Sequence, residues 1–167
     1  MSAVFTQPEA WTFRDRSGWP KGPWDNERSD KIQWIDGATD LDCLLHRNHM
    51  GAWCGYVGVP PGHPLHQRSY EHVNGLTVHG GLTYSDFCDP AGAEGGSGVC
   101  HIARPGRPEA VWWLGFDCGH SYDLIPAFAE MDFGGGAVLQ YRTSGYAAKE
   151  CVDLAAQLAL VGKGGAA

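Results

Sequence analysis

The chain of 167 residues has the length of one domain, and its 43% of hydrophobic residues are enough for a core, which excludes disorder for most of the chain. Its formal net charge of −7 excludes a global positive field that would attract nucleic acid or an anionic membrane surface. Glycine supplies 24 residues, roughly double its usual share, and the lack of a G-x-y period excludes collagen.

The sequence also bears on targeting and on redox state. Neither an apolar run of about 18 residues nor a basic, apolar leader at residues 1–10 is present, so we expect a cytoplasmic protein that binds no membrane. The cysteines are widely spaced without a C-x-x-C pair, and we expect them to be reduced and mostly buried. These six residues are Cys43, Cys54, Cys88, Cys100, Cys118 and Cys151.

The beginning of the chain shows no sustained periodicity. Trp11, Trp19 and Trp24 stand there among prolines, glycines and charges, which predicts an irregular N-terminal arm over residues 1–30, followed by one domain over residues 31–167. Because tryptophan side chains are costly to leave in water, we expect the arm to lie across the domain or against a second subunit, forming a homodimer.

Apolar and alternating segments predict the strands that follow. A short strand is expected at residues 31–35, and an Asn- and Gly-containing loop joins two more, at 41–46 and 52–59, in a β-hairpin. Residues 73–84 are predicted to be extended. The most apolar stretch of strand length, residues 111–118, is predicted to lie at the centre of the sheet.

Helical signals are concentrated at the end of the chain. A short helix is expected within residues 121–131 and a last strand at 137–141. Ser144 is predicted to cap a final helix that ends at Gly162. Its apolar stripe consists of Ala147, Cys151, Leu154, Leu158 and Val161. The elements predict an α+β fold, a mainly antiparallel sheet of about five strands with the C-terminal helix packed on one face.

Candidate chemistry is concentrated in one region. All eight histidines lie between positions 46 and 120, which also hold 14 of the 24 glycines. Imidazole suits proton transfer and metal ligation at neutral pH, and glycine lets a ligand approach the backbone. Asp117, His120 and Asp123 follow an apolar strand, and with His79 they are predicted to form a mixed N/O metal site. Alternatively, Asp117 caps the turn and His120 bonds to backbone.

Three strings carry a family resemblance: WCGYVGVPPGH at residues 53–63, HGGLTY at 79–84 and WWLGFDCGH at 112–120. The chain resembles a family of uncharacterised bacterial and phage proteins in which these strings occur in this order. The resemblance extends from about residue 31 to the C-terminal helix. It implies shared ancestry and transfers no activity, because none is established for the family. The phage connection implies a host-interaction or counter-defence role as one expectation.

A nucleophilic cysteine is a second candidate chemistry. Cys54 or Cys118 could be served by His79 or His120 as base and oriented by Asp117, although a buried structural thiol is the alternative for either cysteine.

Further residues are expected to line the cleft and bind a ligand. They are Tyr56, His63, Gly80, Gly81, Tyr84 and Trp113. A bulge or a close backbone approach is expected at the glycine pair. Of the adjacent Trp112 and Trp113, which point to opposite faces of a strand, one is expected to fill the core while the other packs under the arm or stacks on a planar ligand.

Motifs for nucleotide hydrolysis and for a serine triad are absent, as no phosphate-binding loop or nucleophile elbow occurs. We therefore expect a cleft in which His79, Asp117 and His120 are catalytic, with a divalent metal, Zn or Mn, activating water for hydrolysis or similar processing of a small molecule. The alternative is a non-catalytic, phage- or host-associated module that binds a partner protein or sequesters a small ligand. A third hypothesis is that the chain is a homo-oligomeric structural protein.

Overall fold

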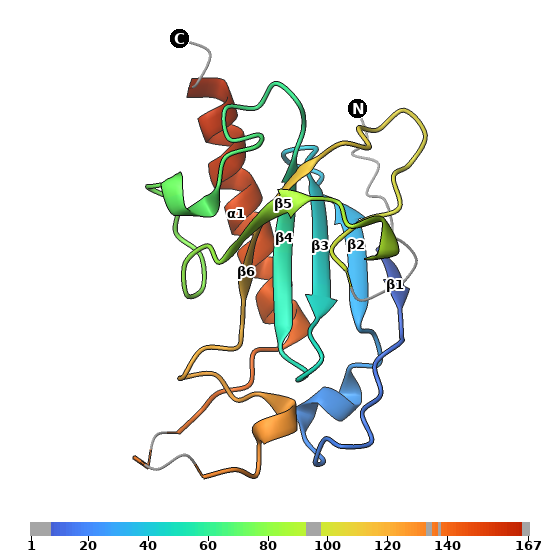
Figure 1. The fold of residues 1–167 in the computed structure, drawn as a ribbon, viewed down its shortest axis with the longest axis vertical. Coiled ribbons are helices and arrows are strands. Elements are labelled where there is room, and N and C mark those ends of the chain that lie inside the picture. Colours follow the sequence, from blue (N-terminus) through green and yellow to red (C-terminus); the bar gives the residue numbers. More distant parts are fainter. Residues whose placement is uncertain (1–7, 93–97, 133–134, 137, 165–167) are drawn as a thin grey trace.

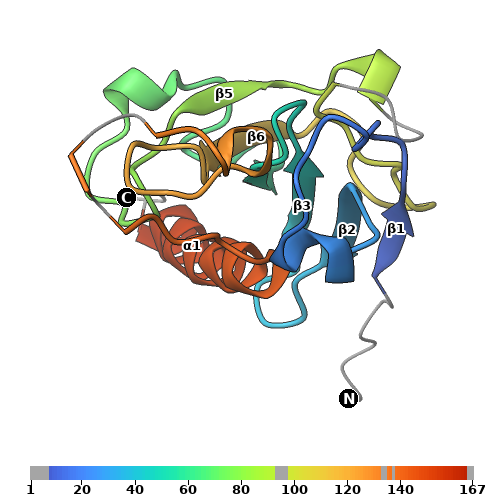
Figure 2. The ribbon, with the colours of Figure 1, turned by 90° about the horizontal axis from the view of Figure 1, so that it is seen from below.

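One antiparallel sheet and one long helix make up the core of the fold. The computed structural model describes residues 8–92, 98–132, 135–136 and 138–164. The strand order is β1-β2-β3-β4-β6-β5, and α1 lies along one face of the 6-stranded sheet (Figures 1 and 2). The expected α+β fold is confirmed, with one strand more than the sequence predicted.

The strands, in chain order, are β1 (Glu9–Trp11), β2 (Lys31–Ile35), β3 (Asp42–Arg47), β4 (Trp53–Val59), β5 (Tyr84–Phe87) and β6 (Trp112–Asp117). The helix α1 spans Ser144–Gly164. Short 3-10 turns occupy Pro23–Asn26, Tyr70–His72, Pro90–Gly92 and Pro126–Phe128. Within the described ranges, no helix is both long enough and apolar enough to cross a membrane.

The predicted hairpin forms the middle of the sheet. Asp42 of β3 lies opposite Gly58 of β4, and β6 pairs with the other edge of β4. β5 pairs with the other edge of β6, so the apolar strand β6 is second from the sheet edge. The prediction that this strand lies at the centre of the sheet is therefore wrong. A Cβ at Gly55 would collide with Phe116 and with Cys151 of α1, so this glycine lets the helix pack closely on the sheet.

The two faces of the sheet bury separate clusters. Cys43, Leu45 and Val57 point toward α1, while the alternate positions Leu44 and Tyr56 point to the opposite face, as the two-residue period of a strand requires. The second face is covered by residues from β5, β6 and the loop between them.

The helix α1 packs by the predicted stripe. Cys151, Leu154 and Leu158 are buried. The prediction of Ser144 as the cap is wrong, because the Oγ1 atom of Thr143 accepts the bond from the Tyr146 amide at 3.1 Å. A capping oxygen reaches an amide of the first turn from the residue that precedes the helix, and that residue is Thr143.

Other predicted elements are shorter in the structure. Residues 73–83 form no strand, because Gly75, Gly80 and Gly81 adopt φ values of +80°, +68° and +79°, which break the extended pairing. The helix expected within 121–131 is reduced to the 3-10 turn at Pro126–Phe128.

The last predicted strand, at 137–141, was also wrong in extent. It is reduced to an isolated bridge between Gln140 and Asp123. Residue 137, where that strand was expected to begin, lies outside the described residues.

The described part of the N-terminal arm is ordered along its own domain. The arm adds β1 to the sheet edge, a strand that the sequence did not predict. Trp24 is 1% exposed and packs edge-on against Tyr141, with the two ring centroids 5.4 Å apart. The buried guanidinium of Arg47 lies between the carboxylates of Asp30 and Glu27, at 3.5 and 3.6 Å. Ionic and aromatic contacts therefore fasten the arm to the end of β3 and to the segment before α1.

Candidate functional site

Three segments meet beside the amino end of α1: the turn after β6 (residues 117–123), the loop before β5 (residues 76–83) and the first turns of the helix. The carboxyl end of β6 and the amino end of α1 lie at the same end of the sheet, which brings these distant segments together (Figure 1). All four residues predicted for the metal site lie here: His79, Asp117, His120 and Asp123.

His79 is held on both ring nitrogens. Its Nε2 lies 2.9 Å from Oδ2 of Asp123, and its Nδ1 lies 2.8 Å from the hydroxyl of Tyr146. Burial and the nearby Glu150 carboxylate raise the pKa of Tyr146, so the phenol keeps its proton. The carboxylate of Asp123 can only accept, so Nε2 of His79 carries a hydrogen and donates a hydrogen bond to it. The side chain of His79 is only 5% exposed.

Asp123 is the buried anion of this cluster. Besides His79, it accepts hydrogen bonds from the Arg142 Nε atom at 2.9 Å and from the His120 amide at 3.0 Å. Its side chain is fully buried, and a carboxylate in that position is stabilised only when several donors and a positive charge surround it. Tyr146, His79, Asp123 and Arg142 therefore form one continuous relay.

Asp117 and His120 form a second, looser pair. Nε2 of His120 lies 3.6 Å from Oδ1 of Asp117, beyond hydrogen-bond distance. Asp117 itself is oriented by the Thr83 hydroxyl at 2.9 Å and by the Gly119 amide at 3.1 Å. Nε2 of His120 is buried and has no hydrogen-bond partner among the described atoms. The imidazole ring is stacked on Tyr122, with ring centroids 5.6 Å apart.

The loop beside His120 requires a glycine at position 80. Its φ of +68° lies in the left-handed region, and a Cβ at this position would overlap Nε2 of His120. The close backbone approach predicted at the glycine pair is confirmed at Gly80. Gly81 has a similar φ of +79°, but open space surrounds the position of its missing Cβ.

The four predicted ligands form two pairs in this structure. The rings of His79 and His120 lie 5.8 Å apart. Among the described residues, the only group that brings three His, Cys, Asp or Glu ligand atoms within 4.8 Å of one another is a different one, formed by Cys88, Cys100 and His101.

A cavity of about 220 Å³ opens beside the Asp117–His120 pair. His120, Ser121 and Asp123 are its polar lining residues, and the rest of its wall is mostly apolar. The residues that line it are Gly119, His120, Ser121, Asp123, Ile125, Phe128 and Leu139. The histidine with the unsatisfied nitrogen thus borders a space for a small ligand.

Other residues predicted to line the cleft lie elsewhere. Trp113 is fully buried on the face away from α1, so this tryptophan fills the core. Tyr56 is buried there too and packs edge-on against Tyr84, with centroids 5.1 Å apart. His63 bonds to the Leu158 carbonyl at 2.7 Å, three helical turns from Tyr146.

The cysteines considered as nucleophiles are buried thiols. Burial raises the pKa of Cys54 to about 12, and burial together with the Asp123 charge raises the pKa of Cys118 further. Both thiols stay neutral near pH 7, which makes them poor nucleophiles and favours the structural alternative.

The sequence patterns did not predict the cluster of Cys88, Cys100 and His101. Cys88 and Cys100 are paired as a disulfide, which corrects the expectation that all six cysteines are reduced; Cys43, Cys54, Cys118 and Cys151 are free and buried. The adjacent Cys100 and His101 were a sequence signal for it. The spacing to Cys88 resembles no short ligand motif, so only the fold reveals the third member.

The comparisons with known proteins add no further assignment. No protein-family model, curated protein or solved structure matches the chain.

Proposed function

We propose that the protein is a small-molecule hydrolase, or a closely related processing enzyme, in which His120 acts as the general base. The observation that carries the proposal is the difference between the two histidines. His79 has both nitrogens engaged, whereas His120 borders the cavity with a carboxylate 3.6 Å away and no hydrogen bond to Nε2.

Catalytic hydrogen bonds are often long in a ligand-free site and shorten when substrate binds. On that basis Asp117 accepts the Nε2 hydrogen of His120 and stabilises the imidazolium. The other ring nitrogen, Nδ1, then removes a proton from the attacking water. Asp117 is fit for this role because Thr83 and Gly119 already fix its two oxygens.

The relay through His79 has a positioning role in this proposal. Asp123 binds the His120 amide at 3.0 Å and is itself held by His79 and Arg142. The relay thereby fixes the turn that carries His120. The mostly apolar wall of the cavity would receive the uncharged part of a substrate.

Metal-assisted hydrolysis is a second form of the proposal. A Zn or Mn ion held by His79, Asp117, His120 and Asp123 would require the two pairs to converge, and it would have to replace the bonds that His79 makes to Tyr146 and Asp123. Elemental analysis of the protein as purified, repeated on Asp117→Asn, tests this form. Loss of a stoichiometric ion in the variant supports it, and a metal-free active protein rejects it.

Turnover of a panel of chromogenic carboxylic, phosphoric and amide substrates tests the acid–base form. His120→Gln is expected to lower kcat by about 100-fold or more, as loss of a general base does. His66→Gln is the matched control, because His66 bonds to the Val59 carbonyl outside this site. Equal turnover in the wild type and in His120→Gln would contradict the proposal.

A sequestering module is the alternative that the apolar cavity also supports. It would hold a small ligand or dock a partner without turnover, and a role between phage and host, as the family resemblance implies, would be of this kind. Mass spectrometry of ligand released on denaturation, together with no turnover on the whole panel, would favour this alternative.

A further inference from the structure

The group formed by Cys88, Cys100 and His101 lies on the sheet face opposite α1, separate from the site described above. A backbone bond from Asp89 to the Val99 carbonyl, 2.9 Å long, holds the two cysteine-bearing segments side by side. One ligand atom from each of the three residues lies within 4.8 Å of the other two. Cys100 and His101 are buried and Cys88 is half-buried.

Two nitrogen atoms lie close to the sulfur of Cys88. The Trp113 Nε1–H group donates to its sulfur at 3.2 Å, and Nδ1 of His101 lies 3.4 Å from the same atom. An N–H donor aimed at a ligating sulfur is a usual outer contact of a metal site. The indole is fully buried, which fixes the direction of this donor.

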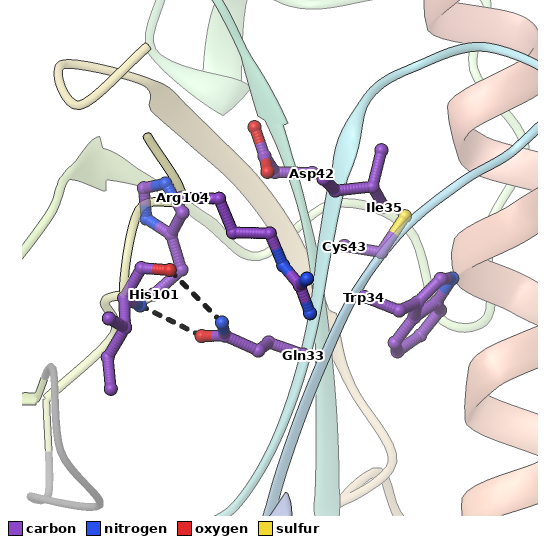
Figure 3. A pocket seen from close by; sticks show the side chains of 8 residues that line it. Gln33, Trp34, Ile35, Asp42, Cys43, His101 and Arg104 are labelled. Atoms are coloured by element: carbon purple, nitrogen blue, oxygen red, sulfur yellow. Dashed lines mark hydrogen bonds between the residues drawn. The ribbon is translucent and has the colours of Figure 1, made fainter. Parts of the chain in front are cut away.

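His101 is also held in place by the sheet. The side-chain amide of Gln33 on β2 both donates to the Ile102 carbonyl at 3.1 Å and accepts from the Ile102 amide at 2.8 Å (Figure 3). These two hydrogen bonds hold Ile102, the residue that follows His101, in place.

We propose that the reduced form of this group, with two thiolates from Cys88 and Cys100 and Nδ1 of His101, binds one thiophilic metal ion such as Zn²⁺. Two sulfurs and an imidazole are the donor set that Zn²⁺ favours, and three protein ligands leave a fourth position for water or an exogenous ligand. Tetrahedral ligation at the usual Zn–S length needs the sulfurs about 3.8 Å apart, which rotation of the two side chains must supply.

The disulfide seen in the structure and the metal-bound form exclude each other. Binding releases one proton from each thiol to solvent. Hydrogen peroxide reverses the state: the two thiolates form the S–S bond and give up two electrons, the O–O bond breaks, two protons are taken up, two waters leave and the metal ion is released. The site is therefore expected to bind metal only while Cys88 and Cys100 are reduced.

Cobalt titration of the full chain tests the proposal. The protein is reduced with a phosphine, freed of metal, and titrated with Co²⁺ while the thiolate-to-cobalt charge-transfer band is followed; Zn²⁺ is then added. One Co²⁺ per chain, displaced by Zn²⁺, is the expected result. The same protein oxidised to the disulfide needs no substitution and is expected to show no such band.

Variants locate the ion. Cys88→Ser and His101→Gln are expected to abolish the band or weaken binding at least about tenfold, and Trp113→Phe to weaken it about tenfold by removing the outer donor. Cys151→Ala, on α1, is the matched cysteine control, and His120→Gln keeps binding because the two sites are independent. No band in the reduced wild type overturns the proposal, as does a band that survives oxidation or Co²⁺ binding of wild-type affinity in Cys88→Ser.

Discussion

Replacing Gly80 by alanine isolates the contact that the site depends on. Gly80 adopts a φ of +68°, in the left-handed region, where an L-residue lowers the unfolding free energy by about 1–2 kcal/mol. The added Cβ also overlaps Nε2 of His120, so the ring must move or the loop must shift. Overpacking of this kind costs about 1–3 kcal/mol, which brings the expected loss of unfolding free energy to about 2–5 kcal/mol.

Gly81→Ala is the matched control for that substitution. Its φ of +79° carries the same backbone cost, but nothing lies within 4 Å of the position where its Cβ would stand. We therefore expect a loss of only about 1–2 kcal/mol in this variant. The difference between the two variants measures the contact with His120.

Urea unfolding of both variants and NMR of the histidine ring resonances form the assay. Gly80→Ala is expected to shift the His120 ring signals and to lower turnover on any substrate found, while Gly81→Ala leaves both close to the wild type. Equal losses of stability, with His120 unshifted in both variants, would refute the packing argument for the glycine pair.

Three further predictions follow from the fold. Folding raises the thiol pKa of Cys54 from 9.0 to about 12, so this thiol contributes stability below pH 9 that is lost as the pH rises. Between pH 8 and pH 10, the unfolding free energy of the wild type, measured with urea, should therefore fall by about 1 kcal/mol more than that of Cys54→Ala. Trp24→Ala should lower the unfolding free energy by about 3–5 kcal/mol without changing the mass measured by light scattering, since Trp24 is buried within its own chain; a changed mass would instead place the arm in a subunit interface. Thr143→Ala should cost about 1 kcal/mol in thermal or urea unfolding and Ser144→Ala much less, because only the Thr143 side chain caps α1; the opposite order would restore Ser144 as the cap.

Local patterns predicted the elements that have a strong period of their own. The hairpin, β6 and the buried stripe of α1 were predicted because alternating or 3.6-residue spacing reflects which face meets a core. The failures lie where glycine or proline sets the conformation, as in residues 73–83 and 121–131. There the φ values depend on contacts made by distant residues, which a local pattern does not contain.

The sequence by itself determined which residue types the candidate site contains: His79, Asp117, His120 and Asp123 are predicted from residue type and from their place near a strand end, and the fold places them as two neighbouring pairs. Only the tertiary structure decided their pairing, because Tyr146 and Arg142 come from the segment around the start of α1 and engage His79 and Asp123. The same holds for Cys88, because the fold of the segment between β5 and β6 brings Cys100 and His101 to its sulfur and β6 brings Trp113. Residue chemistry is local and legible in a sequence, whereas which groups satisfy one another depends on contacts across the whole sheet.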